Sequence, residues 1–176
     1  MEFEETIQHI QNLLGNPDSA EFQQSWPVIE EFRSSLLPSF LEQMVQIYAN
    51  DSLPESLRHM AIILSYQVFP TSYEKLNNNI FESLNLPNEI VSQVLSSASD
   101  CFSDESVNIR TGVATLFSRI ACIDVLTNDS FDITKTLITG FVSPASEGSF
   151  QSICIVLIDL FSCSTMDEEE LGAILE

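Results

Sequence analysis

Apolar side chains recur at intervals of three and four residues along most of the chain, and strict alternation of apolar and polar residues is scarce. Because positions i, i+3 and i+4 share one face of an α-helix, this spacing predicts an all-α protein. The clearest helix is expected to begin near Leu37 and to stop at Asn50. Its apolar stripe consists of Leu37, Phe40, Leu41, Met44, Val45 and Tyr48.

Proline, glycine and short polar residues divide this pattern into successive helices. A first helix is expected to end at Gly15. Asp18 and Glu21 have the spacing of a capping box for a second helix, in which Pro27 is expected to cause a kink or a break. Ser52 and Glu55 have the same spacing and predict a second capping box around Pro54.

Two segments of the chain follow one plan: a turn with an aspartate, a helix start, and then an arginine followed by small residues. Asp51 precedes Arg58 in the first segment, and Asp104 precedes Arg110 in the second. Guanidinium groups at these places are able to bond the aspartate or the backbone carbonyls of a neighbouring repeat. We expect ties between repeats, with contacts to a binding partner as the alternative.

The helices are therefore expected to form an α-solenoid of about four HEAT-type helix pairs. First helices start near residues 2, 37, 86, 130 and 167, an uneven period of the kind found in HEAT or armadillo arrays. The expected pairs span residues 2–36, 37–69, 86–124 and 129–163, with a fifth beginning at 167–176. An irregular insert with a short helix is expected at 73–85. The incomplete last pair predicts the amino-terminal part of a longer solenoid.

The net charge of −20, from 26 acidic and six basic residues, changes the picture most. Such a field repels nucleic-acid phosphates and anionic lipids, and it accelerates encounter with a basic partner. The alternative is that the acids only keep an apolar-rich array soluble. Because of this charge we expect no nucleic-acid binding. The sequence has no run of eighteen apolar residues and no signal-peptide pattern, so we expect no membrane insertion and a location inside the cell.

Residues suited to catalysis, metal binding or nucleotide binding do not cluster in the sequence. The four cysteines are far apart and are expected to be reduced core thiols, and the two histidines fall on different predicted helices. Five scattered glycines cannot form a phosphate-binding loop. We therefore expect no cofactor, no metal and no enzymatic activity. These cysteines and histidines are Cys101, Cys122, Cys154, Cys163, His9 and His59.

Several segments together resemble a known family. Leu37-Pro-Ser-Phe-Leu41 through Ile47-Tyr-Ala-Asn50 is similar to the first helix of its second repeat, and Leu57-Arg-His-Met-Ala61 to the helix that follows. Phe81 falls where the family has an aromatic residue before the third repeat, and Ile120-Ala-Cys122 with Asp124 and Val125 resembles the end of that repeat. In this order, the segments resemble the amino-terminal HEAT repeats of the importin-β type of nuclear transport receptor.

The resemblance implies concave second helices that bind the small GTPase Ran in its GTP form. It also implies a basic cargo or an import adaptor bound further along, nucleoporins bound through later repeats, and a location in cytoplasm, nucleus and nuclear pore. The candidate contacts, chosen because they lie on predicted second helices, are Glu55, Arg58, Tyr66, Glu105, Arg110 and Arg119.

Two positions depart from the family pattern. Tyr66-Gln67 stands where the family commonly has a Lys-Asn pair that contacts Ran, and Ser130-Phe131 stands in place of Trp-Pro after the third repeat. These departures favour an alternative function: a HEAT-repeat scaffold or adaptor in a cytosolic protein complex, without Ran binding.

Overall fold

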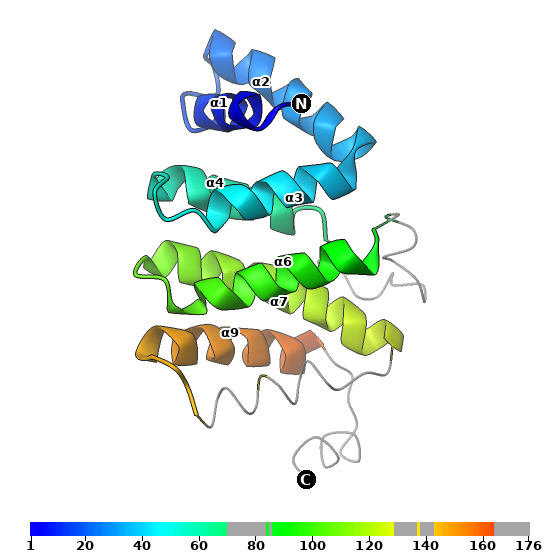
Figure 1. The fold of residues 1–176 in the computed structure, drawn as a ribbon, viewed down its shortest axis with the longest axis vertical. Coiled ribbons are helices and arrows are strands. Elements are labelled where there is room, and N and C mark those ends of the chain that lie inside the picture. The colour runs from blue at the N-terminus through cyan, green and yellow to red at the C-terminus, as the bar shows by residue number, and fades with distance from the viewer. Residues whose placement is uncertain (70–83, 85, 129–136, 138–142, 164–176) are drawn as a thin grey trace.

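The computed structural model describes residues 1–69, 84, 86–128, 137 and 143–163, and all regular structure within them is helical (Figure 1). The predicted all-α class is confirmed. The helices are α1 (Phe3–Leu13), α2 (Ala20–Ser35), α3 (Leu37–Tyr48), α4 (Glu55–Tyr66), α6 (Asn88–Asp100), the short 3-10 helix η2 (Cys101–Ser103), α7 (Val107–Asn128) and α9 (Glu147–Cys163).

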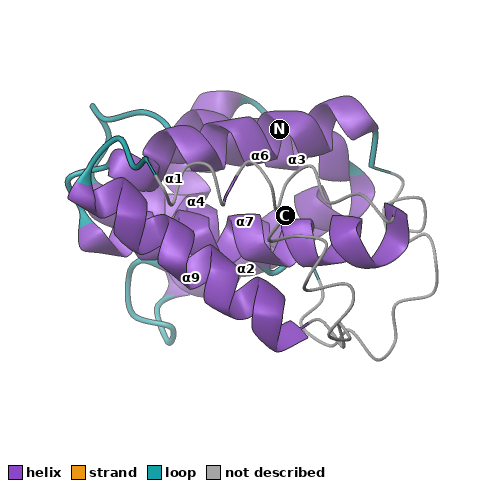
Figure 2. Ribbon diagram, turned by 90° about the horizontal axis from the view of Figure 1, so that it is seen from below, coloured by secondary structure: helices purple, strands orange, loops and turns teal. Residues whose placement is uncertain are grey.

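Helix pairs stack along one long axis. In Figure 1 the pair α1/α2 is followed by α3/α4, then by α6/α7, and then by α9. Figure 2 shows the stack from one end, with α3 and α6 in one layer and α4, α7 and α9 in the other. The helices of each layer pack on their neighbours, α3 on α6, α4 on α7 and α7 on α9, which is the arrangement of an α-solenoid. We call the surface formed by the second helices α2, α4, α7 and α9 the second-helix face.

Helix α3 shows how the sequence pattern produces the core. Five of the six apolar residues predicted to line it are buried, and Leu37 at its start is half-buried. The Tyr48 hydroxyl lies at 0% exposure and donates a hydrogen bond to the Val94 carbonyl of α6 at 3.2 Å. Burial raises the pKa of Tyr48 well above its usual 10.0, so this bond keeps its proton and joins the second repeat to the third.

The start of α2 differs from the prediction. Ser19, and not Asp18, is the N-cap, and its hydroxyl accepts a hydrogen bond from the Phe22 backbone N–H at 3.2 Å. The predicted capping box of Asp18 with Glu21 is therefore wrong. Helix α2 also continues through Pro27 without a break. Pro27 is exposed, so water is able to satisfy the carbonyl that its missing N–H leaves unpaired.

The start of α4 differs in a similar way. Pro54 occupies the N-cap position and no side chain caps the helix, so the predicted box of Ser52 with Glu55 is wrong. The Ser52 hydroxyl instead donates to Asn50 Oδ1 at 2.6 Å. Glu55 reaches across to the next repeat, where it accepts a hydrogen bond from Asn108 Nδ2 at 2.8 Å.

Some apolar residues of the helices lie at the surface. Val107 begins α7 and is 62% exposed, whereas Phe150 and Ile158 of α9 are 38% and 64% exposed. Helix α9 is apolar around its whole circumference between Ile153 and Ile158, so periodicity alone could not select its buried side. Three expected parts of the chain lie largely or wholly outside the described residues. They are the insert at 73–85 apart from residue 84, most of the first helix of the fourth pair, and the fifth pair at 167–176.

Candidate functional site

Arg58 of α4 forms the tie between the second and third repeats. Its Nε donates to the Tyr48 carbonyl at 2.9 Å, and its Nη2 lies 2.5 Å from Asp104 Oδ2 and 3.0 Å from Asp51 Oδ1. The side chains of Arg58 and Asp104 are 8% and 10% exposed, whereas that of Asp51 is 87% exposed. The predicted repeat-to-repeat role of this arginine is confirmed, and its burial leaves little surface for a partner.

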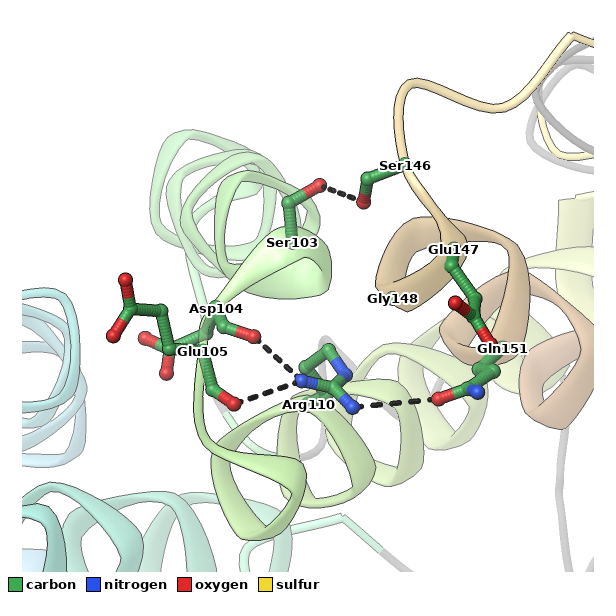
Figure 3. Close-up of a pocket in the computed structure, with 8 residues that line it drawn as sticks. All are labelled: Ser103, Asp104, Glu105, Arg110, Ser146, Glu147, Gly148 and Gln151. Carbon is green, nitrogen blue, oxygen red and sulfur yellow. Dashed lines mark hydrogen bonds between the residues drawn. The ribbon is translucent and has the colours of Figure 1, made fainter.

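Arg110 of α7 occupies the corresponding place one repeat later, with different partners (Figure 3). Its Nη1 donates to the backbone carbonyls of Asp104 and Glu105 at 2.7 and 3.0 Å, and its Nη2 donates to Gln151 Oε1 of α9 at 3.3 Å. Arg110 thus bonds the carbonyl of Asp104, because the carboxylate of that residue is engaged by Arg58. Gly148 makes room for this arrangement, since a Cβ there would lie 2.9 Å from Arg110 Cδ.

An open depression of about 430 Å³ lies beside Arg110, between the third and fourth repeats. The Ser103 and Ser146 hydroxyls face each other across it at 3.0 Å. Its lining is polar and carries both signs of charge, which is typical of a solvated junction between repeats. The lining residues, all drawn in Figure 3, are Ser103, Asp104, Glu105, Arg110, Ser146, Glu147, Gly148 and Gln151.

Arg119 and Tyr66 lie together on the second-helix face. The Arg119 guanidinium stacks over the Tyr66 ring at 4.5 Å from its centroid. Its Nη1 donates to the Tyr66 carbonyl at 2.7 Å and to the Phe69 carbonyl at 3.3 Å. Arg119 therefore closes the carboxyl end of α4 from the next repeat, where unpaired carbonyls and the helix dipole favour a cation.

The two acidic candidates are exposed. Glu55 lies at the first turn of α4, and the hydrogen bond from Asn108 is the main reason that its pKa is lowered. Glu105 lies at the rim of the depression beside Arg110. The structure therefore brings Glu105 next to Arg110 and Tyr66 next to Arg119, while Glu55 and the buried Arg58 belong to the junction of repeats two and three.

The sequence reasoning missed a group on α2. Phe22 and Trp26 stack with their rings parallel to within 5° and their centroids 6.3 Å apart, and Trp26 is 40% exposed. One turn further, Glu30 Oε2 lies 2.6 Å from Arg33 Nη2. Arg33 also donates to Gln67 Oε1 at 3.4 Å, which shows that this flank of α2 is turned toward the end of α4. The signal available in the sequence was the single tryptophan of the chain.

The cysteines and histidines of the described residues have structural surroundings. Burial raises the pKa of Cys101 to about 11, so its thiol stays protonated and unreactive near neutral pH. His9 pairs with the buried Ser25 hydroxyl at 3.0 Å, between α1 and α2. Among the residues that the structure describes, no group of histidine, cysteine and acidic side chains has the arrangement of a metal site. No helix in the described ranges is both long and apolar enough to cross a bilayer.

Comparisons with known proteins support the fold but do not identify a family. No protein-family model matches the sequence, and no curated protein matches it. A chain in a solved structure of Kap95p bound to RanGDP, described in the context of nuclear import complex assembly, is similar to 91% of this chain with a TM-score of 0.78. Sequence identity over the match is 15%, and the match covers 19% of that longer chain. The protein therefore shares the helical solenoid fold of this structure, with HEAT-like helix pairs.

Proposed function

We propose that the chain is an amino-terminal HEAT-repeat segment of a nuclear transport receptor of the importin-β type. It binds Ran in its GTP form on the second-helix face, and it also binds a basic cargo or adaptor, which Ran binding releases. The observation that carries this proposal is the similarity to the Kap95p structure over 91% of the chain, with helix pairs in the same stacked arrangement. Three of the segments that resemble the family in sequence fall on α3, α4 and α7, in the expected order, whereas Phe81 lies outside the described residues.

The charge distribution supports a basic partner. Residues 1–69 contain ten acidic residues and only two arginines, and both arginines are engaged by carboxylates. A field of this sign raises the rate of encounter with a cationic protein segment and weakens as salt is added.

The positive charge expected at the Ran contact is supplied differently from the family pattern. Tyr66 stands where the family has a lysine, but Arg119 brings a guanidinium within 4.5 Å of the Tyr66 ring. Arg119 is half-buried, so part of the side chain stays accessible to an acidic group of a partner. The residue pair Tyr66 and Arg119 thus takes the place of the single lysine.

The mechanism is a shift in population between solenoid curvatures. Ran and cargo favour different curvatures of the array, so each lowers the affinity for the other. The chain performs no chemistry in this scheme. It works in cytoplasm and nucleus and at the nuclear pore, where later repeats contact nucleoporins.

Calorimetric titration of the chain with Ran loaded with GTP or with GDP tests the proposal. Selective binding of the GTP form is expected, and Arg119→Ala should weaken it more than Arg110→Ala, which removes the same charge outside the proposed contact. Circular dichroism of each variant verifies folding before the titration. Equal binding of both nucleotide forms, or no binding by the folded chain, contradicts Ran recognition by this segment.

A scaffold function in a cytosolic complex is the second candidate. It is favoured by Gln67, whose side-chain oxygen accepts a hydrogen bond from Arg33 and is therefore occupied within the chain. Under this function the chain binds a basic protein partner regardless of the nucleotide state of Ran.

A further inference from the structure

One side of α2 is exposed and suited to binding a partner. Phe22, Trp26, Glu30 and Arg33 follow one another at steps of four and three residues, so they lie along one side of the helix. The buried residues of α2, which are Ser25, Ile29 and Phe32, lie on the adjacent side of the helix, and α2 packs on α1 and α3.

This flank belongs to the second-helix face but is left uncovered by its neighbour. Helix α2 packs on α1 and α3 and makes at most slight contact with α4, whereas α4 packs closely on α7. Among the described residues, the hydrogen bond from Arg33 to Gln67 links this flank directly to the second repeat. Trp26 is 40% exposed, and its indole lies parallel to the Phe22 ring.

Glu30 adds an acceptor that the chain does not use. Its Oε2 is paired with Arg33, but its Oε1 is buried and accepts no hydrogen bond from the described residues. An unsatisfied carboxylate oxygen is costly, so a donor that reaches it is bound favourably. The Glu30 side chain as a whole is 33% exposed, so the carboxylate lies at the edge of the surface rather than in the core.

We propose that the α2 flank formed by Phe22, Trp26, Glu30 and Arg33 is a docking site for an extended lysine- and arginine-rich segment of a partner protein. A cationic side chain stacks on the Trp26 indole, and a neighbouring one donates to Glu30 Oε1. The occupant is identified by charge: residues 1–69 carry ten acids against two arginines and no lysine. This inference deepens the proposed function and rests on it for the choice of a basic partner.

The test uses the 176-residue chain and a synthetic nine-residue peptide of alternating lysine, arginine and glycine, at low salt. Because Trp26 is the single tryptophan, its fluorescence reports on this flank alone. We expect a saturable change of emission whose midpoint equals the dissociation constant from calorimetry. By calorimetry, Trp26→Ala should lower the affinity about three- to fivefold, the typical effect of one cation–π contact.

The matched control is the pair Glu30→Gln and Glu31→Gln. Both remove one negative charge from α2, but Glu31 is exposed and turned by about 100° from Glu30 around the helix. Glu30→Gln should weaken peptide binding about threefold, as expected for loss of a charge-assisted bond, and Glu31→Gln should leave it nearly unchanged. Equal effects of the two substitutions would show diffuse attraction and overturn the proposal.

Other outcomes also decide. Absence of peptide binding, or binding without a change in Trp26 emission, overturns the site. Equal binding of an uncharged peptide of the same length, or emission that depends on chain concentration alone, identifies an apolar segment or a second copy as the occupant. Because the titration contains no Ran, its failure leaves Ran recognition standing, and failure of Ran to bind leaves the peptide result valid.

Discussion

Arg58 and Asp104 belong to different repeats, yet their side chains form a largely buried ion pair with Nη2 and Oδ2 2.5 Å apart. The same guanidinium holds the Tyr48 carbonyl at the end of α3. One side chain therefore fixes both the pairing of helices within the second repeat and the position of the third repeat on top of it.

Removing Arg58 should cost more stability than any surface substitution. Arg58→Ala leaves the buried Asp104 carboxylate without its counter-charge, and loss of about 3 kcal/mol in the free energy of unfolding is expected. Urea denaturation followed by circular dichroism measures it. Asp51→Asn is the matched control, because Asp51 faces the same arginine at 87% exposure, and a change below about 0.5 kcal/mol is expected. A similar loss for both substitutions would contradict the assigned roles.

Gly148 and Arg110 should be coupled. Gly148→Ala places a methyl group against Arg110 Cδ, so the gain from replacing glycine within a helix is offset by displacement of the guanidinium. In an Arg110→Ala background, the same substitution should stabilise the chain by about 0.5–1 kcal/mol. A double-mutant cycle of unfolding free energies gives the coupling directly. Additive effects would show that Arg110 does not occupy the space over Gly148.

Gly112→Ala serves as a comparison within the core. A Cβ at Gly112 would lie 3.0 Å from Ile62 Cγ2, and Ile62 is fully buried between α4 and α7. The neighbour has little room to move, so we expect a loss of about 1–3 kcal/mol, typical of overpacking. The thermal unfolding midpoint of the Gly112→Ala variant should fall, and adding Arg110→Ala should not restore it.

Alkaline pH should destabilise the fold. Burial raises the pKa of Cys101 from 9.0 to about 11, and burial raises that of Tyr48 as well. Between pH 9 and 11 the unfolded chain releases the Cys101 proton while the folded chain retains it, so the stability falls as pH rises through this window. Urea midpoints from pH 7 to 11 should decline above pH 9. Cys101→Ser should flatten the part of the decline due to the thiol, and an unchanged profile would assign the decline to other groups.

Replacing Arg119 by lysine, which keeps the positive charge, should still lower the stability of the chain. Arg119→Lys keeps a cation but loses the planar group that stacks on Tyr66 while bonding two carbonyls. We expect a loss of about 1–2 kcal/mol, with faster amide hydrogen exchange at the end of α4. Full protection in the lysine variant would show that charge alone closes this helix.

The buried face of a helix could be predicted where its apolar residues lie along one side. Helix α3 has one clear stripe, and most of its buried residues belong to it, although Ile47 is buried as well. Helix α9 has apolar residues on every side, and the serines Ser149 and Ser152 are buried there while Ile158 is exposed. The Ser152 hydroxyl donates either to the Gly148 carbonyl one turn earlier or to the Phe102 carbonyl. A partner as distant in sequence as Phe102 cannot be recognised from a linear pattern.

The candidate site was predictable only in part, for a related reason. Spacing behind the acidic turns was enough to find Arg58 and Arg110 and to assign them to junctions between repeats. It could not show that Asp104 would pair with the arginine of the preceding repeat, since that choice depends on how the repeats are stacked. Trp26 was missed because a single exposed aromatic residue produces no periodic signal.

The slight contact between α2 and α4 has a mechanical consequence. Among the described residues, the joint between repeats two and three is fastened by the Arg58 ion pair and by Arg119 on the end of α4. On the second-helix side of the first joint, the described side-chain link is the 3.4 Å hydrogen bond from Arg33 to Gln67. On this side of the array we therefore expect the first repeat to separate from the second more easily than the second separates from the third. On the opposite side, Gln43 of α3 bonds Thr6 and the Met1 carbonyl, so the expected motion is a hinge that opens at α2.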